Sequence, residues 1–319
     1  MSSVADAAGA CGAAVDVVVV THQSAATLGA ALDAVRRAPR VNSILVVDNA
    51  SCDDTRRVAN EAGVTVVPNE RNVGFAAGVN AGLPLCRSPY VLLLNPDAVL
   101  LPDDLDRLVR ALQADKAAVA AGPMLVGESG RAIVGGRRFS TPLNRLFALA
   151  PVTRRWRHGR LGPEYPRGMA VSRQPATVDY LWGAALLLRR DFLARIGGLD
   201  GRFFLYSEDE DLGRAARALG ARMLLVPTAR AGHVGGVSSA GDEGIALARL
   251  GHALALGLEK WTSARQAALF RAGFRAVLVA RVARDKLLAD NASVAADARA
   301  LRVFTRLCRG ADPAGRFEG

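Results

Sequence analysis

The amino-acid sequence predicts an α/β fold, in which a mostly parallel sheet flanked by helices is followed by a C-terminal helical extension. Apolar, β-branched runs alternate with helical patterns through the N-terminal third of the chain, and the loops between them are short. This alternation is typical of a parallel sheet with right-handed crossovers. Half of the 319 residues are hydrophobic and 22% are charged, which is the profile of a globular chain. After His233 the pattern is helical to the end.

Each element of the predicted sheet follows from a local pattern. Apolar runs predict buried strands at 15–21, 43–48 and 90–95, and a further strand is expected at 64–68. Between them, helices are expected around 28–35 and over 53–62, and a glycine-rich segment at 72–83 opens a third. Regular structure is expected again at 180–190, in a short helix from Asp191, in a helix within 203–220 and in a strand at 221–227.

Three parts are expected along the chain: a disordered tail at 1–14, a sheet domain at 15–240 and the helical extension at 241–319. Within the sheet domain, residues 128–175 are rich in Gly, Arg and Pro and predict a long irregular connection. The four cysteines form no Cys-x-x-Cys pair, which argues against a disulfide framework or a thiolate zinc site. No signal-peptide pattern and no apolar run long enough for a bilayer are present, so we expect a cytoplasmic protein.

The net charge of +11 is concentrated in two basic zones. Residues 137–173 contain nine arginines and one acid, Glu164, and residues 261–319 contain eleven basic and five acidic side chains. Such zones suggest an anionic partner, either phosphates, a membrane surface or nucleic acid, and the alternative is a solvated basic face. Nucleic acid is disfavoured because aromatic residues, which would form stacking platforms, are only 5% of the chain.

Residues 264–289 combine an apolar stripe with arginines, a pattern typical of helices that lie at a membrane interface. The alternative is that the stripe packs on the sheet domain or forms a homodimer. The stripe consists of Leu269, Phe270, Phe274, Val277, Leu278, Val282 and Leu287, and the arginines around it are Arg271, Arg275, Arg281 and Arg284.

Polar residues follow the predicted strands at the edge where α/β sheets bind ligands. Thr21 ends the first strand, Asp48 and Asn49 end the second, and Asn95-Pro96-Asp97 ends the fourth. A carboxylate such as Asp97 could bind Mg²⁺ or Mn²⁺ together with substrate phosphates, whereas the alternative is ordinary turn chemistry.

Two further candidates lie beyond the first four strands. The acidic run 208–211 opens a helix, where it could supply a general base or simply favour the helix dipole. His233 follows a strand among glycines and could bind a metal, although a lone loop histidine often has no such role. No G-x-G-x-x-G, Walker lysine or G-x-S-x-G motif is present, which argues against a dehydrogenase, a phosphate-loop ATPase and a serine hydrolase.

Together these segments resemble glycosyltransferase family 2, in particular its rhamnosyltransferase-like branch. The resemblance runs from Val15 to Ser239 and rests on VVVVTHQSAATL, VVDNASCDDT, NVGFAAGVNAGL, LLNPDAVL, YLWGAALLLRRDFLARIGGLDGRFFLYSEDEDLGRAARALG and HVGGVS. It implies a GT-A fold and a donor that is a nucleotide-diphosphate sugar. One segment departs from the family pattern, since the usual Thr-Tyr-Asn is Thr21-His22-Gln23 here.

The resemblance also implies roles for individual residues. Asp97 would end a variant D-x-D motif and, with His233, hold the metal. Asp209 would be the catalytic base, with Glu208 beside it in the family's Glu-Asp motif. The remaining residues would bind the nucleotide-sugar or the acceptor sugar: Thr21, Asp48, Asn49, Asn72, Gly74, Asn95, Trp182 and Gly183.

The implied function is an inverting, metal-dependent transfer of a sugar to a hydroxyl of a glycan or lipid-linked acceptor in cell-envelope polysaccharide synthesis. We expect dTDP-L-rhamnose as donor, with UDP-hexose, UDP-GlcNAc or UDP-galactofuranose as alternatives. The expected site of action is the inner face of the cell membrane. A nucleotidyltransferase would need a Gly-rich basic loop after the first strand, and this sequence lacks one. A non-catalytic relative should have lost Asp97, Asp209 or His233, and all three are present.

Overall fold

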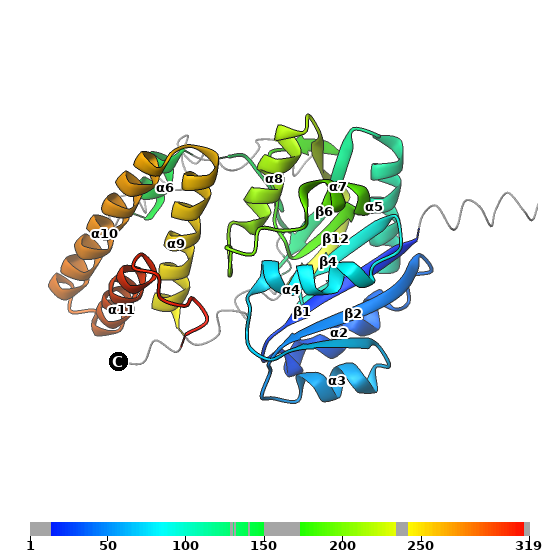
Figure 1. Ribbon diagram of the computed structural model, residues 1–319, viewed down its shortest axis with the longest axis horizontal. Coiled ribbons are helices and arrows are strands. Elements are labelled where there is room, and N and C mark those ends of the chain that lie inside the picture. Colours follow the sequence, from blue (N-terminus) through cyan, green and yellow to red (C-terminus); the bar gives the residue numbers. More distant parts are fainter. Residues whose placement is uncertain are drawn as a thin grey trace, which may run out of the picture. The chain divides into compact units, whose positions relative to one another are not determined.

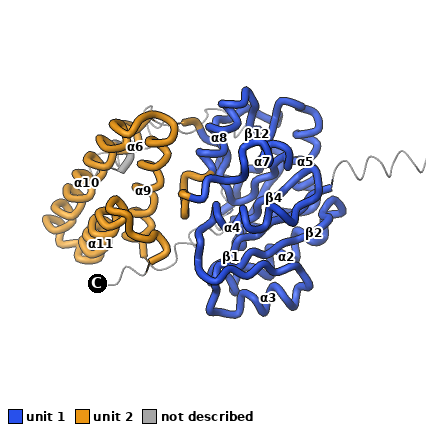
Figure 2. The backbone as a smooth tube through the Cα atoms, in the orientation of Figure 1, with its two compact units in different colours: residues 1–137, 166–201, 209–238 blue, residues 138–165, 202–208, 239–319 orange. Residues whose placement is uncertain are grey.

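The computed structural model describes residues 14–127, 130, 132–139, 141–149, 173–233 and 242–315. The described residues fall into two compact units (Figure 2). Unit 1 lies within 1–137, 166–201 and 209–238, and unit 2 lies within 138–165, 202–208 and 239–319. Unit 2 is therefore built from three stretches of chain and not from the C-terminal helices alone.

Unit 1 contains the predicted mostly parallel sheet, which the structure confirms (Figure 1). Its first half has the order β3-β2-β1-β4, and all neighbours in it are parallel. The strands are β1 (Val15–Thr21), β2 (Val41–Asn49), β3 (Thr65–Asn69) and β4 (Tyr90–Leu94). Every residue of β1 and β4 is buried, as expected for runs that are apolar on both faces.

The second half of the sheet continues from β4 in the order β11-β6-β12-β5. β11 is antiparallel to both β4 and β6, β12 is parallel to β6, and β5 is antiparallel to β12. Two short strands lie beside this path, since β7 pairs with β6 and β9 pairs with β12. β8 and β10 form a separate two-stranded sheet. Their bounds are β5 (Ala98–Leu100), β6 (Ala118–Val126), β7 (Ala132–Ile133), β8 (Gly136–Arg137), β9 (Ala176–Val178), β10 (Tyr180–Leu181), β11 (Ala185–Arg189) and β12 (Arg222–His233).

Helices of unit 1 cover both faces of the sheet. Val19 of β1 lies in a core cluster with Leu32 of α2 and Leu108 of α5, whereas Val20, its neighbour in the strand, lies beside α4. The helices are α2 (Ala25–Val35), α3 (Thr55–Glu61), α4 (Phe75–Gly82), η1 (Leu83–Leu85), α5 (Pro102–Ala114), α7 (Arg190–Ile196) and α8 (Glu208–Ala218). The helices expected around 28–35, over 53–62, in 72–83, from Asp191 and within 203–220 correspond to α2, α3, α4, α7 and α8, whereas α5 was not predicted from the sequence.

A buried carboxylate joins three strands of the sheet. Asp16 of β1 is fully buried, and its Oδ1 accepts hydrogen bonds from Asn42 and Ser43 of β2 at 2.9 and 2.7 Å. Its Oδ2 accepts the backbone N–H groups of Arg87 and Ser88, just before β4, at 2.6 and 2.7 Å. Burial alone would raise the pKa of Asp16, but these hydrogen bonds outweigh it and lower the pKa to about 2.

Unit 2 is a bundle of helices. It contains α6 (Pro142–Leu149), α9 (Glu243–Trp261), α10 (Ala264–Leu287) and α11 (Asn291–Leu307). The side chains of Asp242, Ser263 and Asp290 cap the last three by accepting a backbone N–H in the first turn. None of the described helices is both long and apolar enough to cross a membrane.

The expected apolar stripe of α10 is divided between the inside and the outside of this bundle. Phe270, Phe274 and Leu278 are buried, and the Phe274 ring packs on Phe304 of α11 with ring centroids 4.7 Å apart. These three residues therefore contribute to the core of unit 2 and are not available to a membrane. Leu269 and Leu287 remain 65% and 87% exposed.

The expected irregular connection contains more structure than the sequence suggested. Its described part includes β7, β8 and the helix α6. The expected tail up to residue 13 and the five arginines at 154, 155, 157, 160 and 167 lie outside the described residues.

Candidate active site

The topology of unit 1 gathers the predicted residues at one edge of the sheet. β1, β2 and β4 are parallel, so Thr21, Asn49 and Asn95 follow strand ends on the same side. β12 runs in the same direction, because β11 is antiparallel to both β4 and β6 and β12 is parallel to β6. His233, the last residue of β12, therefore lies at this edge as well.

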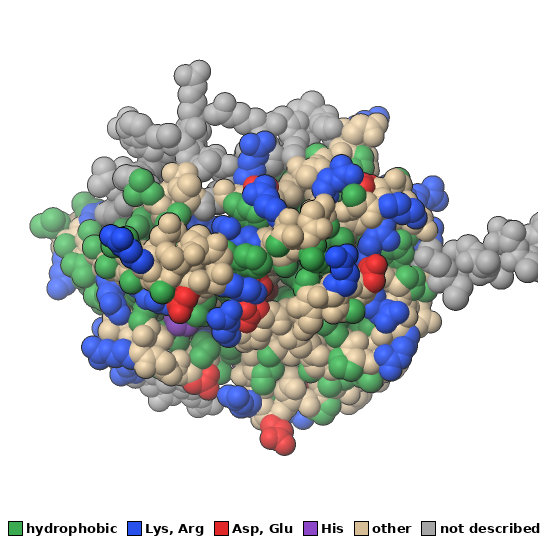
Figure 3. Space-filling model, turned by 45° about the horizontal axis from the view of Figure 1, so that its top comes forward, with side chains coloured by type: hydrophobic (Ala, Val, Ile, Leu, Met, Phe, Trp, Pro, Cys, Tyr) green, Lys and Arg blue, Asp and Glu red, His purple; other side chains and the backbone are tan. Residues whose placement is uncertain are grey.

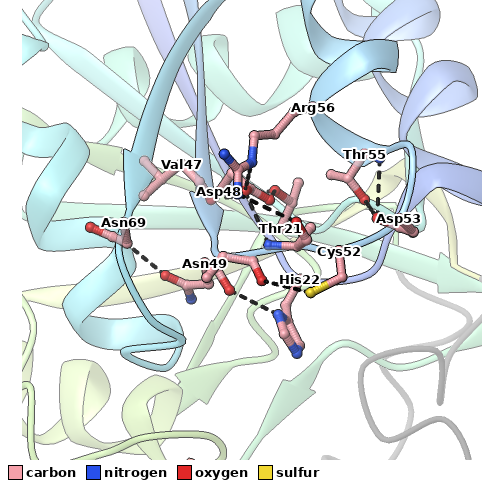
Figure 4. Close-up of polar contacts among 12 residues, drawn as sticks. Thr21, His22, Val47, Asp48, Asn49, Cys52, Asp53, Thr55, Arg56 and Asn69 are labelled. Carbon is pink, nitrogen blue, oxygen red and sulfur yellow. Dashed lines mark hydrogen bonds and ion pairs between the residues drawn. The ribbon is translucent and has the colours of Figure 1, made fainter.

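A buried carboxylate organises the ends of β1 and β2 (Figure 4). Asp48 is fully buried, and its Oδ1 accepts a hydrogen bond from the Thr21 hydroxyl at 3.2 Å. Its Oδ2 lies 2.8 Å from Nε of Arg56 and accepts the Ser51 backbone N–H at 3.1 Å. The Arg56 side chain is 48% exposed, so it carries positive charge to the surface beside the strand ends. Arg56 was not predicted from the sequence, because no sequence motif marks this residue of α3 as part of a site.

Asn49 ties the strand end to the glycine-rich segment. Its Nδ2 donates to the carbonyl of Gly74 at 3.0 Å, and its Oδ1 accepts from Asn69 at 2.8 Å. Asn72 Oδ1 in turn accepts the Gly74 backbone N–H at 3.0 Å, and Gly74 has a φ of 84°, which favours glycine. Because the Asn49 side chain is buried and bonded at both ends, it positions the Gly74 turn that begins α4.

The two residues that depart from the family pattern also make internal contacts. His22 Nδ1 lies 2.8 Å from the carbonyl of Asn49 (Figure 4). Gln23 Oε1 accepts the backbone N–H groups of Cys52 and Asp53 at 3.1 and 3.0 Å, and Gln23 itself has a φ of 53°. Both side chains thus hold the loop after β2. The sequence offered no signal for this role, since the contacts join segments distant along the chain.

The structure brings Asp97 and His233 together. Strand pairing places His233 opposite Ala98, the residue after Asp97, and His233 Nε2 lies 3.5 Å from Asp97 Oδ1. The Asp97 side chain is only 2% exposed, and no described residue donates a hydrogen bond to its Oδ1. A buried carboxylate oxygen without a donor is unfavourable unless a cation or a ligand compensates for it.

This pair fits a divalent metal. Two ligands of an octahedral ion at about 2.1 Å stand about 3 Å apart, close to the separation of Asp97 Oδ1 and His233 Nε2. A carboxylate and an imidazole are a donor set that Mn²⁺ and related ions accept. Among the described residues no group of three or more His, Cys, Asp or Glu side chains could hold a metal, so the pair is the candidate that the described part of the chain offers.

Trp182 and Gly183 lie next to Asn95. They come just before β11, whose first residue pairs with the last residue of β4, and the Asn95 backbone N–H donates to the Ala184 carbonyl at 2.9 Å. Below Trp182 lies Arg137, which is 1% exposed and whose guanidinium stands 3.9 Å from the centre of the indole ring. Asn95, directly after β4, and Trp182, in the β10–β11 turn, are both half-buried.

The acidic run separates into two pairs at the start of α8. Glu210 and Asp211 are buried, and Glu210 accepts two hydrogen bonds from Arg214, which marks it as structural. Glu208 and Asp209 are half-buried. Asp209 Oδ1 accepts the Glu210 backbone N–H at 2.7 Å.

The start of α8 follows an unusual turn, and α8 packs very closely on the β9–β10 connection. Tyr206 and Ser207, directly before it, have φ values of 73° and 65°, a conformation that costs free energy in non-glycine residues. Gly213 of α8 lies so close to the β9–β10 connection that a Cβ there would stand 2.3 Å from the Asp179 carbonyl oxygen. Arg217 adds an ion pair with Asp179 at 2.8 Å.

Comparisons with known proteins show which family this chain belongs to. The family model described as glycosyl transferase family 2 matches residues 16–197, more than half of the chain. A curated relative from Mycobacterium tuberculosis, N-acetylglucosaminyl-diphospho-decaprenol L-rhamnosyltransferase, is 29% identical over 215 residues, which are 60% of this chain and 66% of the relative. The chain thus spans just under two thirds of that protein. A Haloferax volcanii protein, low-salt glycan biosynthesis hexosyltransferase Agl10, is 25% identical over 56% of this chain and 54% of its own.

Solved structures share the fold at low sequence identity. The mannosyltransferase PcManGT from Pyrobaculum calidifontis, in complex with GDP-Man and Mn²⁺, has a TM-score of 0.55 and 17% identity, covering 93% of this chain and 88% of that one. GalNAc-T7 with UDP, GalNAc and Mn²⁺ has a TM-score of 0.52 and 17% identity over 69% of this chain and 43% of that one. By the family match and the shared architecture, this chain belongs to glycosyl transferase family 2 and has the GT-A fold.

Proposed function

We propose that this protein is an inverting, metal-dependent glycosyltransferase that moves L-rhamnose from dTDP-L-rhamnose to a hydroxyl of a glycan or lipid-linked acceptor in cell-envelope polysaccharide synthesis. The observation that carries the proposal is the Asp97–His233 pair, a buried carboxylate oxygen and an imidazole 3.5 Å apart at the ligand-binding edge of the sheet. The rhamnosyltransferase relative supports the choice of sugar and of a lipid-diphosphate acceptor.

Asp97 and His233 would hold Mg²⁺ or Mn²⁺, and Asn95 would lie beside them in the variant D-x-D motif. Two protein ligands leave the other coordination positions to water and to the donor diphosphate. When bound, the ion neutralises negative charge that grows on the leaving diphosphate. The exposed guanidinium of Arg56, next to Thr21 and Asp48 on the nucleotide side, adds positive charge at the same edge.

Asp209 would act as the general base. Its carboxylate accepts the proton of the acceptor hydroxyl while that oxygen bonds to the anomeric carbon, and the bond from this carbon to the diphosphate oxygen breaks in the same step. Attack from the face opposite the leaving group inverts the configuration. Glu208, the neighbouring half-buried acid, and the Trp182–Gly183 turn would help to orient the acceptor or the donor sugar.

The nucleotide side of the site would be preorganised and not assembled on binding. The Thr21 hydroxyl donates to Asp48 at 3.2 Å. In a second set, hydrogen bonds of 3.0 Å join Asn49 to Gly74 and Gly74 to Asn72. Most of their polar side-chain atoms already have protein partners, so we propose that they shape the pocket and present backbone groups to the nucleotide.

The test is metal-dependent donor binding, measured by titration calorimetry with a panel of dTDP-L-rhamnose, UDP-glucose, UDP-GlcNAc and UDP-galactofuranose. We expect dTDP-L-rhamnose to bind only with Mn²⁺ or Mg²⁺, and Asp97→Asn to weaken that binding at least about 100-fold, because loss of an outer-shell partner alone costs 10–100-fold. Asp103→Asn, the same change at an exposed carboxylate of α5, is the matched control.

Two results would contradict the proposal. Donor binding that is unchanged in excess chelator would remove the metal from the mechanism. A clear preference for one of the UDP-sugars would replace the donor while leaving the metal site intact.

A further inference from the structure

The outward face of α10 in unit 2 carries no charge over most of its length. From Ala268 to Ala283, the exposed positions of this helix are Leu269, Val279 and five alanines, at 268, 272, 276, 280 and 283. At about 100° per residue these positions fall within one sector of about 120°. A helix face turned to water is ordinarily polar, so this face is unusual.

The bulky members of this face project strongly from the surface. Leu269, Val279 and Leu287 are 65%, 54% and 87% exposed, and Leu288, one residue beyond the helix, is 69% exposed. Among the described residues nine large hydrophobic side chains are exposed, and these are four of them. The inner face of the same helix is already satisfied, since Phe270, Phe274 and Leu278 are buried in the bundle. The outer face is therefore a second apolar surface that the bundle does not use.

Positive charge lies at the two ends of this face, whereas Arg271 and Arg281 of α10 form ion pairs with Glu259 and Asp297. α10 carries six basic residues and one acid, Asp285, which is 1% exposed and paired with Arg284. Arg265 at the first turn and Lys286 at the last lie at the two ends of the apolar face, and neither has an ion-pair partner among the described residues. Figure 3 shows hydrophobic and basic side chains side by side on the part of the surface where Figure 1 places the C-terminal helices.

This charge distribution indicates whether a second copy of the chain or an anionic lipid surface covers the outer face of α10. Pairing α10 with α10 of a second copy would bring like charges together, because an antiparallel pair sets Arg265 against the other copy's Lys286 and a parallel pair sets each against itself. An anionic lipid surface meets the same cations with opposite charge and accepts the leucine and valine side chains at the level of the headgroups. We propose that the outer face of α10, defined by Leu269, Val279 and Leu287, binds the protein peripherally to an anionic membrane.

The test is flotation of the full chain with vesicles, without donor or acceptor, so its outcome is separate from that of the proposed activity. We expect binding to vesicles of phosphatidylcholine and phosphatidylglycerol in equal parts and little binding to phosphatidylcholine alone. Binding should fall at least about tenfold in about 1 M salt, where the Debye length is about 3 Å. The double variant Leu269→Asp, Val279→Asp should lose at least about tenfold in partitioning at low salt, since it places two acids on the inserted face.

The matched control is Leu85→Asp, Leu101→Asp, which makes the same change at two exposed leucines of unit 1. It should bind within about twofold of the unchanged protein, and circular dichroism of both variants checks that they fold. The proposal is overturned if the unchanged protein fails to float with anionic vesicles at low salt, or if both double variants lose binding equally. It is also overturned if light scattering shows a dimer that the α10 variant converts to a monomer, because the face would then join two copies.

Discussion

Replacing Asp16 by asparagine should destabilise the sheet without touching the candidate active site. Asp16 accepts four hydrogen bonds from Asn42, Ser43, Arg87 and Ser88, and thereby joins β1, β2 and the start of β4 at the edge opposite Thr21. An asparagine at this position keeps one acceptor oxygen but turns an NH₂ group toward donors. At least one buried N–H or O–H group then loses its acceptor.

The pKa of Asp16 sets the size of the effect. A decrease from the ordinary value of 3.8 to about 2 corresponds to about 2 kcal/mol of stability at neutral pH. Because the pKa in the folded state is the lower one, this contribution is fully present above pH 3.8 and is lost as the pH falls through about 2. About half of it should already be gone at pH 3, by the same linkage relation.

Urea unfolding followed by circular dichroism measures this at pH 7 and at pH 3. At pH 7 we expect Asp16→Asn to lower the free energy of unfolding by about 2 kcal/mol or somewhat more. The deficit should shrink by about 1 kcal/mol at pH 3, since the unchanged protein then loses part of the carboxylate's contribution. Asp33→Asn, at a carboxylate that is 60% exposed on α2, serves as control and should change stability by less than about 0.5 kcal/mol. A deficit that is equal at both pH values would refute the assigned role of the charge.

Other parts of the molecule allow equally direct measurements. Asp209→Asn should lower kcat at least about 100-fold while donor affinity stays within a few-fold, because a general base acts in the transition state; a parallel collapse of donor affinity would make Asp209 a ligand or a structural acid. Gly213→Ala should lower the free energy of unfolding by about 1–3 kcal/mol, since its Cβ would collide with the Asp179 carbonyl, whereas Gly29→Ala in α2 has room and should stabilise the helix slightly. Burial raises the pKa of the Cys86 thiol to about 11, so at pH 8 only about one in a thousand of these thiols is ionised, and a thiol reagent should modify exposed Cys52 long before Cys86. Equal reaction rates of the two thiols would show that β4 and α4 open readily.

The strands of the first half of the sheet were predictable from sequence because a strand buried on both faces needs a continuous apolar run. Residues 15–21 and 90–94 lie in such runs, and in the structure both are fully buried, parallel neighbours. The order of strands and helices also predicted that Thr21, Asp48 and Asn95 would follow strand ends at one edge. Local pattern and chain order were sufficient for these statements, since neither depends on which distant residue packs against which.

The partners within the site depended on the tertiary structure. His233 meets Asp97 because β12 runs antiparallel to β5 in a register that pairs His233 with Ala98, and no local pattern encodes that register. In the same way, the Gln23 side chain accepts hydrogen bonds from Cys52 and Asp53, and Arg56 pairs with Asp48, across loops whose course only the folded sheet defines.

The helix α10 shows the same division between sequence and structure. Its sequence determined that leucines, valines, phenylalanines and arginines recur with helical spacing, and therefore which of them share a face. It did not determine which apolar face would be buried, because that choice depends on the side chains that α9 and α11 present. Packing with Phe304 took Phe270, Phe274 and Leu278 inside and left Leu269, Val279 and Leu287 in contact with solvent. Periodicity assigns residues to faces, whereas only long-range packing decides which face is covered.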